Sequence, residues 1–77
     1  MSKQAKQDSR IINSVQRSIL ILDSFNRKNP ELGITELANR LELPKSTVAG
    51  LVYTLQEMGY LDQNPETRKY RLGLRLI

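Results

Sequence analysis

The 77-residue sequence contains no cysteine and no histidine, and each absence narrows the range of functions. Without cysteine there is no disulfide framework, which favours a reducing, cytoplasmic setting. Without histidine the chain lacks the commonest metal ligand and the commonest general base. No apolar run approaches the roughly 18 residues that a membrane span needs, and the polar start MSKQAKQDSR has no apolar signal-peptide core. The sequence therefore predicts one small soluble domain that is not exported, not bound to a membrane and not an enzyme.

Positive charge is concentrated toward both ends of the chain. Residues 1–28 carry a net charge of +4, residues 29–61 carry −2, and residues 62–77 carry +2. The overall charge of +4 suits a polyanionic partner. Many basic domains bind no polyanion, however, so a merely solvated basic surface is the alternative.

The first helical pattern follows a polar segment, residues 1–12, that is expected to be a flexible arm. Asn13 or Ser14 can cap a helix that is expected to end near Arg27-Lys28, where Asn29-Pro30 stops it. The apolar residues that recur at helical spacing in this segment are Val15, Ile19, Leu22 and Phe25.

Two further helices are predicted to meet at a short joint, Glu42-Leu43. Thr35 is expected to cap the second helix, which would bury Leu37, Ala38 and Leu41. Pro44 opens the third helix, about residues 44–58, and Gly59 is expected to follow its last turn. The buried stripe of the third helix is predicted to comprise Val48, Leu51, Val52, Leu55 and Met58.

After Gly59 the apolar period changes from 3.6 to 2, which predicts two short strands at residues 60–63 and 69–72. Between them, Asn64-Pro65-Glu66-Thr67 is typical of a type I turn. A helix, an extended link, two closely joined helices and a hairpin together predict an α+β fold. Its architecture is a winged helix-turn-helix spanning residues 13–73.

The third helix is the predicted reading element. In a helix-turn-helix, the second helix of the pair lies in the major groove of DNA and its first residues meet base edges. Here its outward face is predicted to carry small or polar residues that allow close approach: Lys45, Ser46, Ala49, Gly50 and Tyr53, with Thr47 at the edge. The alternative for Lys45-Ser46-Thr47 is an ordinary polar first turn without a DNA contact. Thr47 is expected either to bond a phosphate or to cap that turn. Tyr53 is expected either to contact DNA or to pack on the rim of the core.

Further DNA contacts are predicted outside the third helix. Arg68, Lys69 and Arg71 lie at and beside the hairpin tip, where they are expected to follow the DNA backbone or enter the minor groove. A solvated hairpin face is the alternative. Thr35 and Arg17 are expected to add contacts, whereas the basic residues of the arm serve either phosphate binding or solubility.

Three motifs carry a resemblance to a known family: Ser14-Val15-Gln16-Arg17, Leu43-Pro44-Lys45-Ser46-Thr47, and Pro65-Glu66-Thr67 followed by Tyr70-Arg71-Leu72-Gly73. Together they make residues 13–77 similar, without a gap, to the DNA-binding domain of the IclR (isocitrate lyase regulator) family. The resemblance implies a bacterial repressor or activator that binds double-stranded operator DNA as a homodimer. It also implies that residues 74–77 begin a linker helix to a C-terminal domain absent from this sequence. A small-molecule effector is expected only for that domain, and no cofactor is expected here.

The sequence departs from the family pattern at two positions. The family often has arginine at Gly50, so we expect either unusually close approach to DNA there or a shift of specificity to Lys45 and Tyr53. The family usually has glycine at Arg68, where a left-handed backbone is expected; arginine would carry strain on the order of 1 kcal/mol, which a DNA contact would offset.

Two rival binding functions make different predictions. A winged helix that binds proteins predicts an exposed apolar patch on the third helix or the hairpin. An RNA-binding winged helix predicts aromatic residues exposed for stacking, for which only Tyr53 and Tyr60 are candidates. Sequence-specific binding of duplex DNA is therefore the predicted function.

Overall fold

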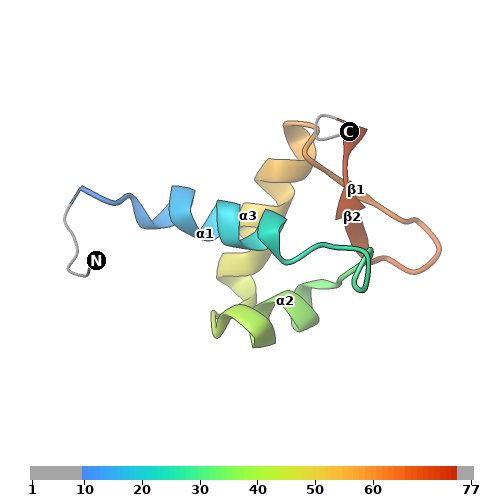
Figure 1. Cartoon of the computed structure of the whole chain (residues 1–77), viewed down its shortest axis with the longest axis horizontal. Coiled ribbons are helices and arrows are strands. Elements are labelled where there is room, and N and C mark those ends of the chain that lie inside the picture. Colours follow the sequence, from blue (N-terminus) through green and yellow to red (C-terminus); the bar gives the residue numbers. More distant parts are fainter. Residues whose placement is uncertain (1–9, 75–77) are drawn as a thin grey trace.

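A computed structural model of the chain describes residues 10–74. Five elements follow one another: α1 (Asn13–Asp23), α2 (Ile34–Leu41), α3 (Lys45–Glu57), β1 (Leu61–Gln63) and β2 (Tyr70–Leu72). Figure 1 shows α1 crossing α3 and α2 near the N-terminal end of α3. The hairpin lies to the right of α3 in this view. This arrangement confirms the predicted α+β winged helix-turn-helix. No helix within residues 10–74 is long and apolar enough to cross a membrane.

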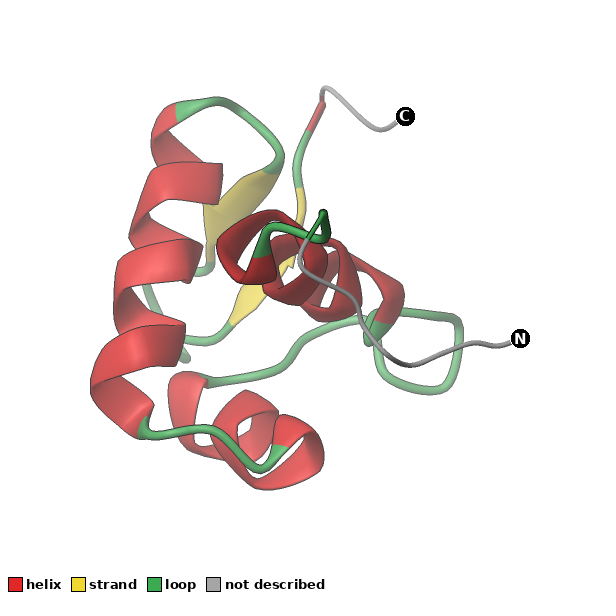
Figure 2. Cartoon of the chain, turned by 90° about the vertical axis from the view of Figure 1, so that its left-hand side faces the viewer, coloured by secondary structure: helices red, strands yellow, loops and turns green. Residues whose placement is uncertain are grey.

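The core forms around α3, which packs against α1, α2 and β1. Figure 2 shows α3 upright, with α1 seen nearly along its axis and the strands behind. Among the described residues, nine buried apolar side chains come from all parts of the fold: Ile21, Phe25, Leu32, Leu37, Ala38, Val48, Val52, Leu55 and Leu61. Full burial of one such aliphatic side chain contributes about 1.5–3 kcal/mol, so this cluster fixes how α3 is presented.

The joint between α2 and α3 is short and contains a left-handed residue. Glu42 has a φ of 55°, and the following Leu43 N–H donates to the carbonyl of Ala38 at 3.1 Å. Pro44 is the N-cap of α3 in an extended conformation, so the helix itself begins at Lys45. The sequence predicted this joint and the start of α3 to within one residue.

The end of α3 is closed as Gly59 predicts. Gly59 has a φ of 88°, and its N–H donates to the Gln56 carbonyl at 3.0 Å. The N–H of Tyr60 donates to the Leu55 carbonyl at 2.9 Å. These two hydrogen bonds form a Schellman motif, the common C-terminal cap with a left-handed glycine. The chain therefore turns directly from α3 into β1.

The hairpin is a minimal antiparallel sheet with an added edge contact. Its register pairs Leu61 with Leu72, Asp62 with Arg71 and Gln63 with Tyr70. Leu32, in the link between α1 and α2, forms a bridge to Tyr70 through two backbone hydrogen bonds of 2.9 and 2.8 Å. The link is thus held against β2, as Figure 1 shows.

Helix α1 differs from the prediction at both ends. Its N-cap is Ile12, without a side-chain cap, so neither Asn13 nor Ser14 caps it, and it ends at Asp23 instead of Arg27-Lys28. Beyond it, Asn26 Oδ1 accepts hydrogen bonds from the N–H groups of Lys28 and Asn29, both at 2.9 Å. This local turn satisfies backbone groups that a longer helix would have used.

Not every residue of the predicted apolar patterns is buried. Val15 and Ile19 of α1 are about half exposed, at 54% and 52%, because Ile21 occupies the buried side of that helix. Met58 is 59% exposed, because it follows the last turn of α3, where the chain has already left the helix. The prediction was right for Phe25, Leu37, Ala38, Val48, Val52 and Leu55, all of which are buried.

Candidate nucleic-acid interface

The outward face of α3 is open along its whole predicted length. Val48, Val52 and Leu55 point into the core, which leaves the opposite side of the helix free. The predicted residues on that side are all exposed: Lys45, Ser46, Ala49, Gly50 and Tyr53. Tyr53 is 62% exposed, so it does not pack on the rim of the core. Small and polar groups therefore line a convex surface that can enter a groove.

The first turn of α3 offers backbone donors as well as side chains. The first helical hydrogen bond runs from the Val48 N–H to the Pro44 carbonyl at 3.1 Å, so the amides of residues 45–47 precede it. Thr47 is half-buried and makes no side-chain cap, which removes one of the two roles predicted for it. Amides at a helix N-terminus favour anions, so this turn suits a phosphate oxygen.

Gly50 lies in the middle of this face. A Cβ atom added at Gly50 would meet no heavy atom within 4 Å, so the protein itself does not require glycine here. The Gly50 carbonyl accepts a hydrogen bond from Thr54 Oγ1 at 2.9 Å. The fold therefore supplies no reason for glycine at this position.

Thr35 and Arg17 lie on other helices. Thr35 is exposed in the first turn of α2 but is not its cap, because Gly33 holds that position. The Glu36 carboxylate accepts the Gly33 N–H at 2.8 Å, so the polar side-chain contact at the start of α2 comes from Glu36 and not from Thr35. Arg17 is half-buried on α1. Neither side chain makes a hydrogen bond to the outward face of α3 within residues 10–74.

The wing loop, residues 64–69, is wider than the predicted type I turn. The Arg68 N–H donates to the Asn64 carbonyl and the Asn64 N–H donates to the Lys69 carbonyl, both at 2.8 Å. Asn64 Oδ1 accepts the N–H of Glu66 at 2.9 Å and that of Thr67 at 3.4 Å, which holds the loop from inside. Arg68 has a φ of 67°, which confirms the left-handed conformation expected there.

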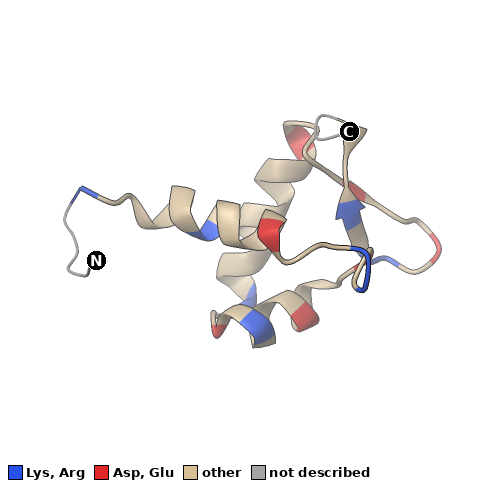
Figure 3. Cartoon of the chain, viewed as in Figure 1, with Lys and Arg blue, Asp and Glu red and all other residues tan. Residues whose placement is uncertain are grey.

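Two of the three wing cations are paired with acids of the same chain. Lys69 Nζ lies 3.4 Å from Glu36 Oε1, and Arg71 Nη1 lies 3.7 Å from Glu31 Oε2. The pKa of Glu36 lies below its usual value, chiefly because the Gly33 N–H donates to the carboxylate and also because Lys69 is near. Figure 3 shows basic and acidic residues interleaved around the hairpin and the link beside it. The wing is therefore less basic in space than it is in sequence.

Sequence reasoning missed the residues that hold the wing. Glu31 accepts from Asn64 Nδ2 at 3.1 Å and from Thr67 Oγ1 at 3.2 Å. Both contacts join residues more than 30 positions apart, so no local spacing points to them. The one available signal was Asn64, whose side chain was expected to favour a turn. Within residues 10–74, no group of three or more His, Cys, Asp or Glu could hold a metal ion.

Comparison with known proteins places this geometry in a family. The profile of the IclR helix-turn-helix domain matches residues 14–65. The chain is 52% identical over 67 residues to the HTH-type transcriptional regulator XynR of Escherichia coli (strain K12), covering 87% of this chain and 27% of that protein. It is 38% identical over 66 residues to the HTH-type transcriptional regulator KdgR of Dickeya chrysanthemi, covering 86% of this chain and 21% of that protein.

Solved structures agree with the sequence comparison. An IclR family transcriptional regulator from Brucella abortus superposes with a TM-score of 0.87 at 29% identity, covering 99% of this chain and 29% of that one. A regulator from Alicyclobacillus acidocaldarius gives a TM-score of 0.83, also at 29% identity, covering 87% of this chain and 27% of that one. These relatives are transcriptional regulators and not enzymes, as the sequence predicted. The chain belongs to the IclR helix-turn-helix family and is a DNA-binding domain of the type found in these transcriptional regulators.

Proposed function

We propose that this chain binds a specific operator in double-stranded DNA, with α3 in the major groove. The observation that carries the proposal is the outward face of α3, whose five predicted residues are exposed while its opposite face is buried. The side chains of Lys45, Ser46 and Tyr53 form no hydrogen bond or ion pair within residues 10–74, so they are available to base edges. Ala49 and Gly50 leave room for the duplex to approach the helix.

Phosphate contacts complete the proposed interface. The first-turn amides of α3, Thr47 and Thr35 lie at helix N-termini, where anions are favoured. Arg68 extends from the wing loop toward the backbone or the minor groove, with Lys69, Arg71 and Arg17 as further cations. Because each phosphate contact releases counterions, log K is expected to fall by about 0.9 per contact for each tenfold rise in salt.

The proposed assembly is a homodimer that reads two half-sites. Support comes from an apolar surface at the start of the described chain, outside the core: Ile11, Ile12, Val15, Ile19 and Leu20 are between 43% and 65% exposed. A patch of this kind marks a protein contact more often than free surface. It lies on α1 and the residues before it, whereas a protein-binding winged helix without a DNA role predicts such a patch on α3 or the hairpin.

A longer regulator is the proposed setting. The chain spans 27% of XynR and 21% of KdgR, so most of each relative lies outside the matched region. In this scheme residues 1–12 form an arm, residues 13–73 form the DNA-binding domain, and residues 74–77 begin a linker to an effector-binding domain. Leu74 is 82% exposed, and residues 1–9 and 75–77 lie outside the described part of the chain. A small-molecule effector would bind that further domain, and the regulator would act in the cytoplasm as a repressor or an activator.

The proposal is tested by selecting duplexes from a random-sequence pool at two salt concentrations and sequencing those that the protein retains. Enrichment of one half-site, in tandem or as a palindrome, is the expected result. Salt-sensitive retention without enrichment would show that the isolated chain grips the backbone only. No retention at low salt would contradict the proposed function.

A further inference from the structure

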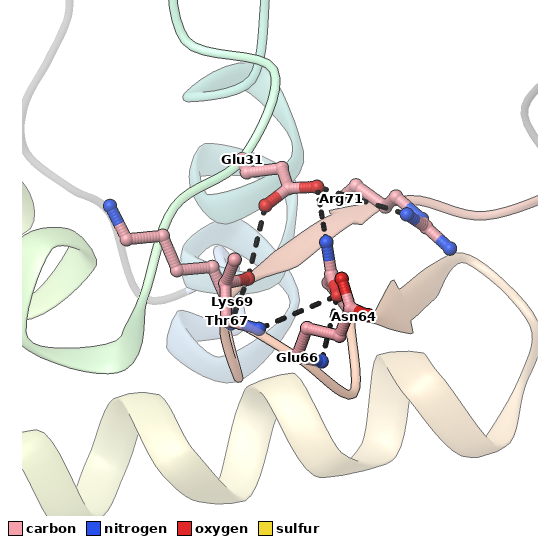
Figure 4. A network of polar contacts seen from close by, with 6 residues as sticks. All are labelled: Glu31, Asn64, Glu66, Thr67, Lys69 and Arg71. Carbon is pink, nitrogen blue, oxygen red and sulfur yellow. Dashed lines mark hydrogen bonds and ion pairs between the residues drawn. The ribbon is translucent and has the colours of Figure 1, made fainter.

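A single carboxylate ties the wing loop and β2 to the link between α1 and α2. Glu31 Oε2 accepts from Asn64 Nδ2 at 3.1 Å and lies 3.7 Å from Arg71 Nη1, while Oε1 accepts from Thr67 Oγ1 at 3.2 Å. Figure 4 shows the three groups converging on Glu31. The Glu31 side chain is only 29% exposed, so these partners replace much of its water.

A second carboxylate, Glu36 at the start of α2, pairs with Lys69 of the wing loop. Its Oε1 lies 3.4 Å from Lys69 Nζ and also accepts the Gly33 N–H at 2.8 Å. In Figure 4 the Lys69 and Arg71 side chains extend to opposite sides of the loop, so each meets a different acid. Among the wing cations, only Arg68 makes no ion pair within the described residues.

We propose that Glu31 and Glu36 are selectivity residues that withhold Arg71 and Lys69 from the phosphates of DNA of arbitrary sequence. The inference rests on the proposed function, in which Lys69 and Arg71 contact phosphates. It adds that each cation must first break its ion pair to make that contact. To reach a phosphate, Arg71 must leave Glu31, and a bare carboxylate then remains close to the duplex. Lys69 and Glu36 stand in the same relation.

The strength of these pairs suits such a role. Lys69, Glu36 and Arg71 side chains are all close to half exposed, at 46%, 46% and 48%, and exposed ion pairs are weak. Weak pairs can be exchanged once α3 is seated at its correct sequence and holds the wing near the backbone. Binding to random DNA depends almost entirely on phosphate contacts. Withholding Arg71 and Lys69 therefore lowers binding to random DNA more than it lowers binding to the correct sequence.

Charge-neutral variants provide the direct test. Glu31→Gln and Glu36→Gln are each compared with Glu57→Gln, which makes the same charge change at an exposed acid that forms no ion pair within residues 10–74. The double variant is compared with Asp23→Asn/Glu57→Gln, because Asp23 is also exposed and without an ion pair in that range. The double variant is expected to bind a random-sequence duplex about threefold to tenfold more tightly than this double control at low salt. The slope of log K against log salt is expected to steepen by about 1–2, from the two freed cations. Affinity of the double variant within twofold of Asp23→Asn/Glu57→Gln at every salt concentration would overturn the proposal.

A second comparison distinguishes the release of Arg71 from a general loss of order in the wing loop. In the parent, Arg71→Ala is expected to change affinity for random DNA by less than about twofold, because Arg71 is already engaged. In the Glu31→Gln background the same change is expected to weaken binding severalfold. If Arg71→Ala costs the parent as much as it costs Glu31→Gln, Arg71 was never withheld and the proposal is wrong.

A polyanion without base sequence separates this inference from the proposed function. Later elution of the double variant than of the charge-matched Asp23→Asn/Glu57→Gln from a heparin column in a salt gradient would show that the two cations are released. That result would stand even if the parent retained no duplex in the selection experiment, which would contradict the proposed function alone. Co-elution of the two variants would overturn the inference, whatever the parent does with DNA.

Discussion

The outward face of α3 and the wing both carry the residues expected at a DNA interface, yet they differ in what those residues already contact. On α3, Lys45, Ser46 and Tyr53 are exposed, and their side chains form no hydrogen bond or ion pair within residues 10–74. On the wing, Lys69 and Arg71 are paired with acids of the link and α2. Residues without internal partners can bind at no cost beyond their own ordering, whereas paired ones must first be released.

The same contrast holds for the backbone of the two regions. Gly50 on α3 faces open space, while Gly73 at the base of the wing is enclosed: a Cβ atom added there would lie 2.4 Å from the Gly59 carbonyl oxygen. Reading surfaces are thus left free, and the wing is built into the fold. Substitutions on α3 should change binding with little change in stability, and substitutions at the wing base should do the reverse.

The largest expected effect on stability is at the wing base. Gly73→Ala forces a methyl group against the backbone at Gly59, where the Gly73 N–H also donates to the Tyr60 carbonyl at 2.8 Å. We expect a loss of about 1–3 kcal/mol in the free energy of unfolding, measured by urea denaturation. Gly33→Ala is the matched control, because its added Cβ would lie 3.6 Å from Glu36 Oε1, an ordinary contact. Equal losses for the two variants would contradict the contrast.

The next effect concerns the left-handed wing residue. Arg68→Gly is expected to raise the free energy of unfolding by about 1 kcal/mol, because arginine at a φ of 67° carries backbone strain. Arg68→Ala keeps the strain and removes the guanidinium, so it should weaken DNA binding without adding stability. If Arg68→Gly binds DNA as tightly as the parent, the idea that a DNA contact offsets the strain is wrong.

A smaller gain in stability is expected on α3. Gly50→Ala should stabilise the protein by about 0.5–1 kcal/mol, because glycine is unfavourable inside a helix and nothing lies within 4 Å of the added methyl group. Ala49→Gly is the reverse substitution on the same exposed face and should destabilise by a similar amount. If Gly50→Ala also binds DNA as tightly and as selectively as the parent, close approach at Gly50 is excluded.

The smallest effect is the contribution of Glu36 to acid stability. Because the folded state lowers the pKa of Glu36, its contribution is present above the unfolded pKa and is lost as pH falls through the folded pKa. The parent should therefore lose more stability than Glu36→Gln when thermal unfolding is followed from neutral to acidic pH. A parallel loss in both proteins would show that Glu36 gains nothing from Gly33 and Lys69.

Local signals in the sequence predicted the elements well and the long-range polar contacts poorly. Pro44 and Gly59 mark the ends of α3 because their backbone preferences act within a few residues. The early end of α1 depends on Asn26 accepting two amides, a competition that helical periodicity does not reveal. Glu42 is left-handed without being glycine or asparagine, because the short joint requires it.

The predicted interface shows the same division. Exposure of the α3 face followed from helical geometry once the buried stripe was known. The pairing of Arg71 with Glu31 did not, since it depends on the Leu32–Tyr70 bridge that brings the link beside β2. Three neighbouring cations therefore looked more available in the sequence than they are in space.

One measurement tests the central claim, that α3 reads sequence and the wing supplies backbone affinity. The parent, Lys45→Ala and Arg68→Ala would be titrated with the selected duplex and with a scrambled duplex of equal length, at two salt concentrations. Lys45→Ala is expected to lose about tenfold in the ratio of the two affinities. Arg68→Ala should weaken both duplexes alike and lower the salt slope by about 1. An unchanged ratio in Lys45→Ala, with a lost ratio in Arg68→Ala, would contradict the account.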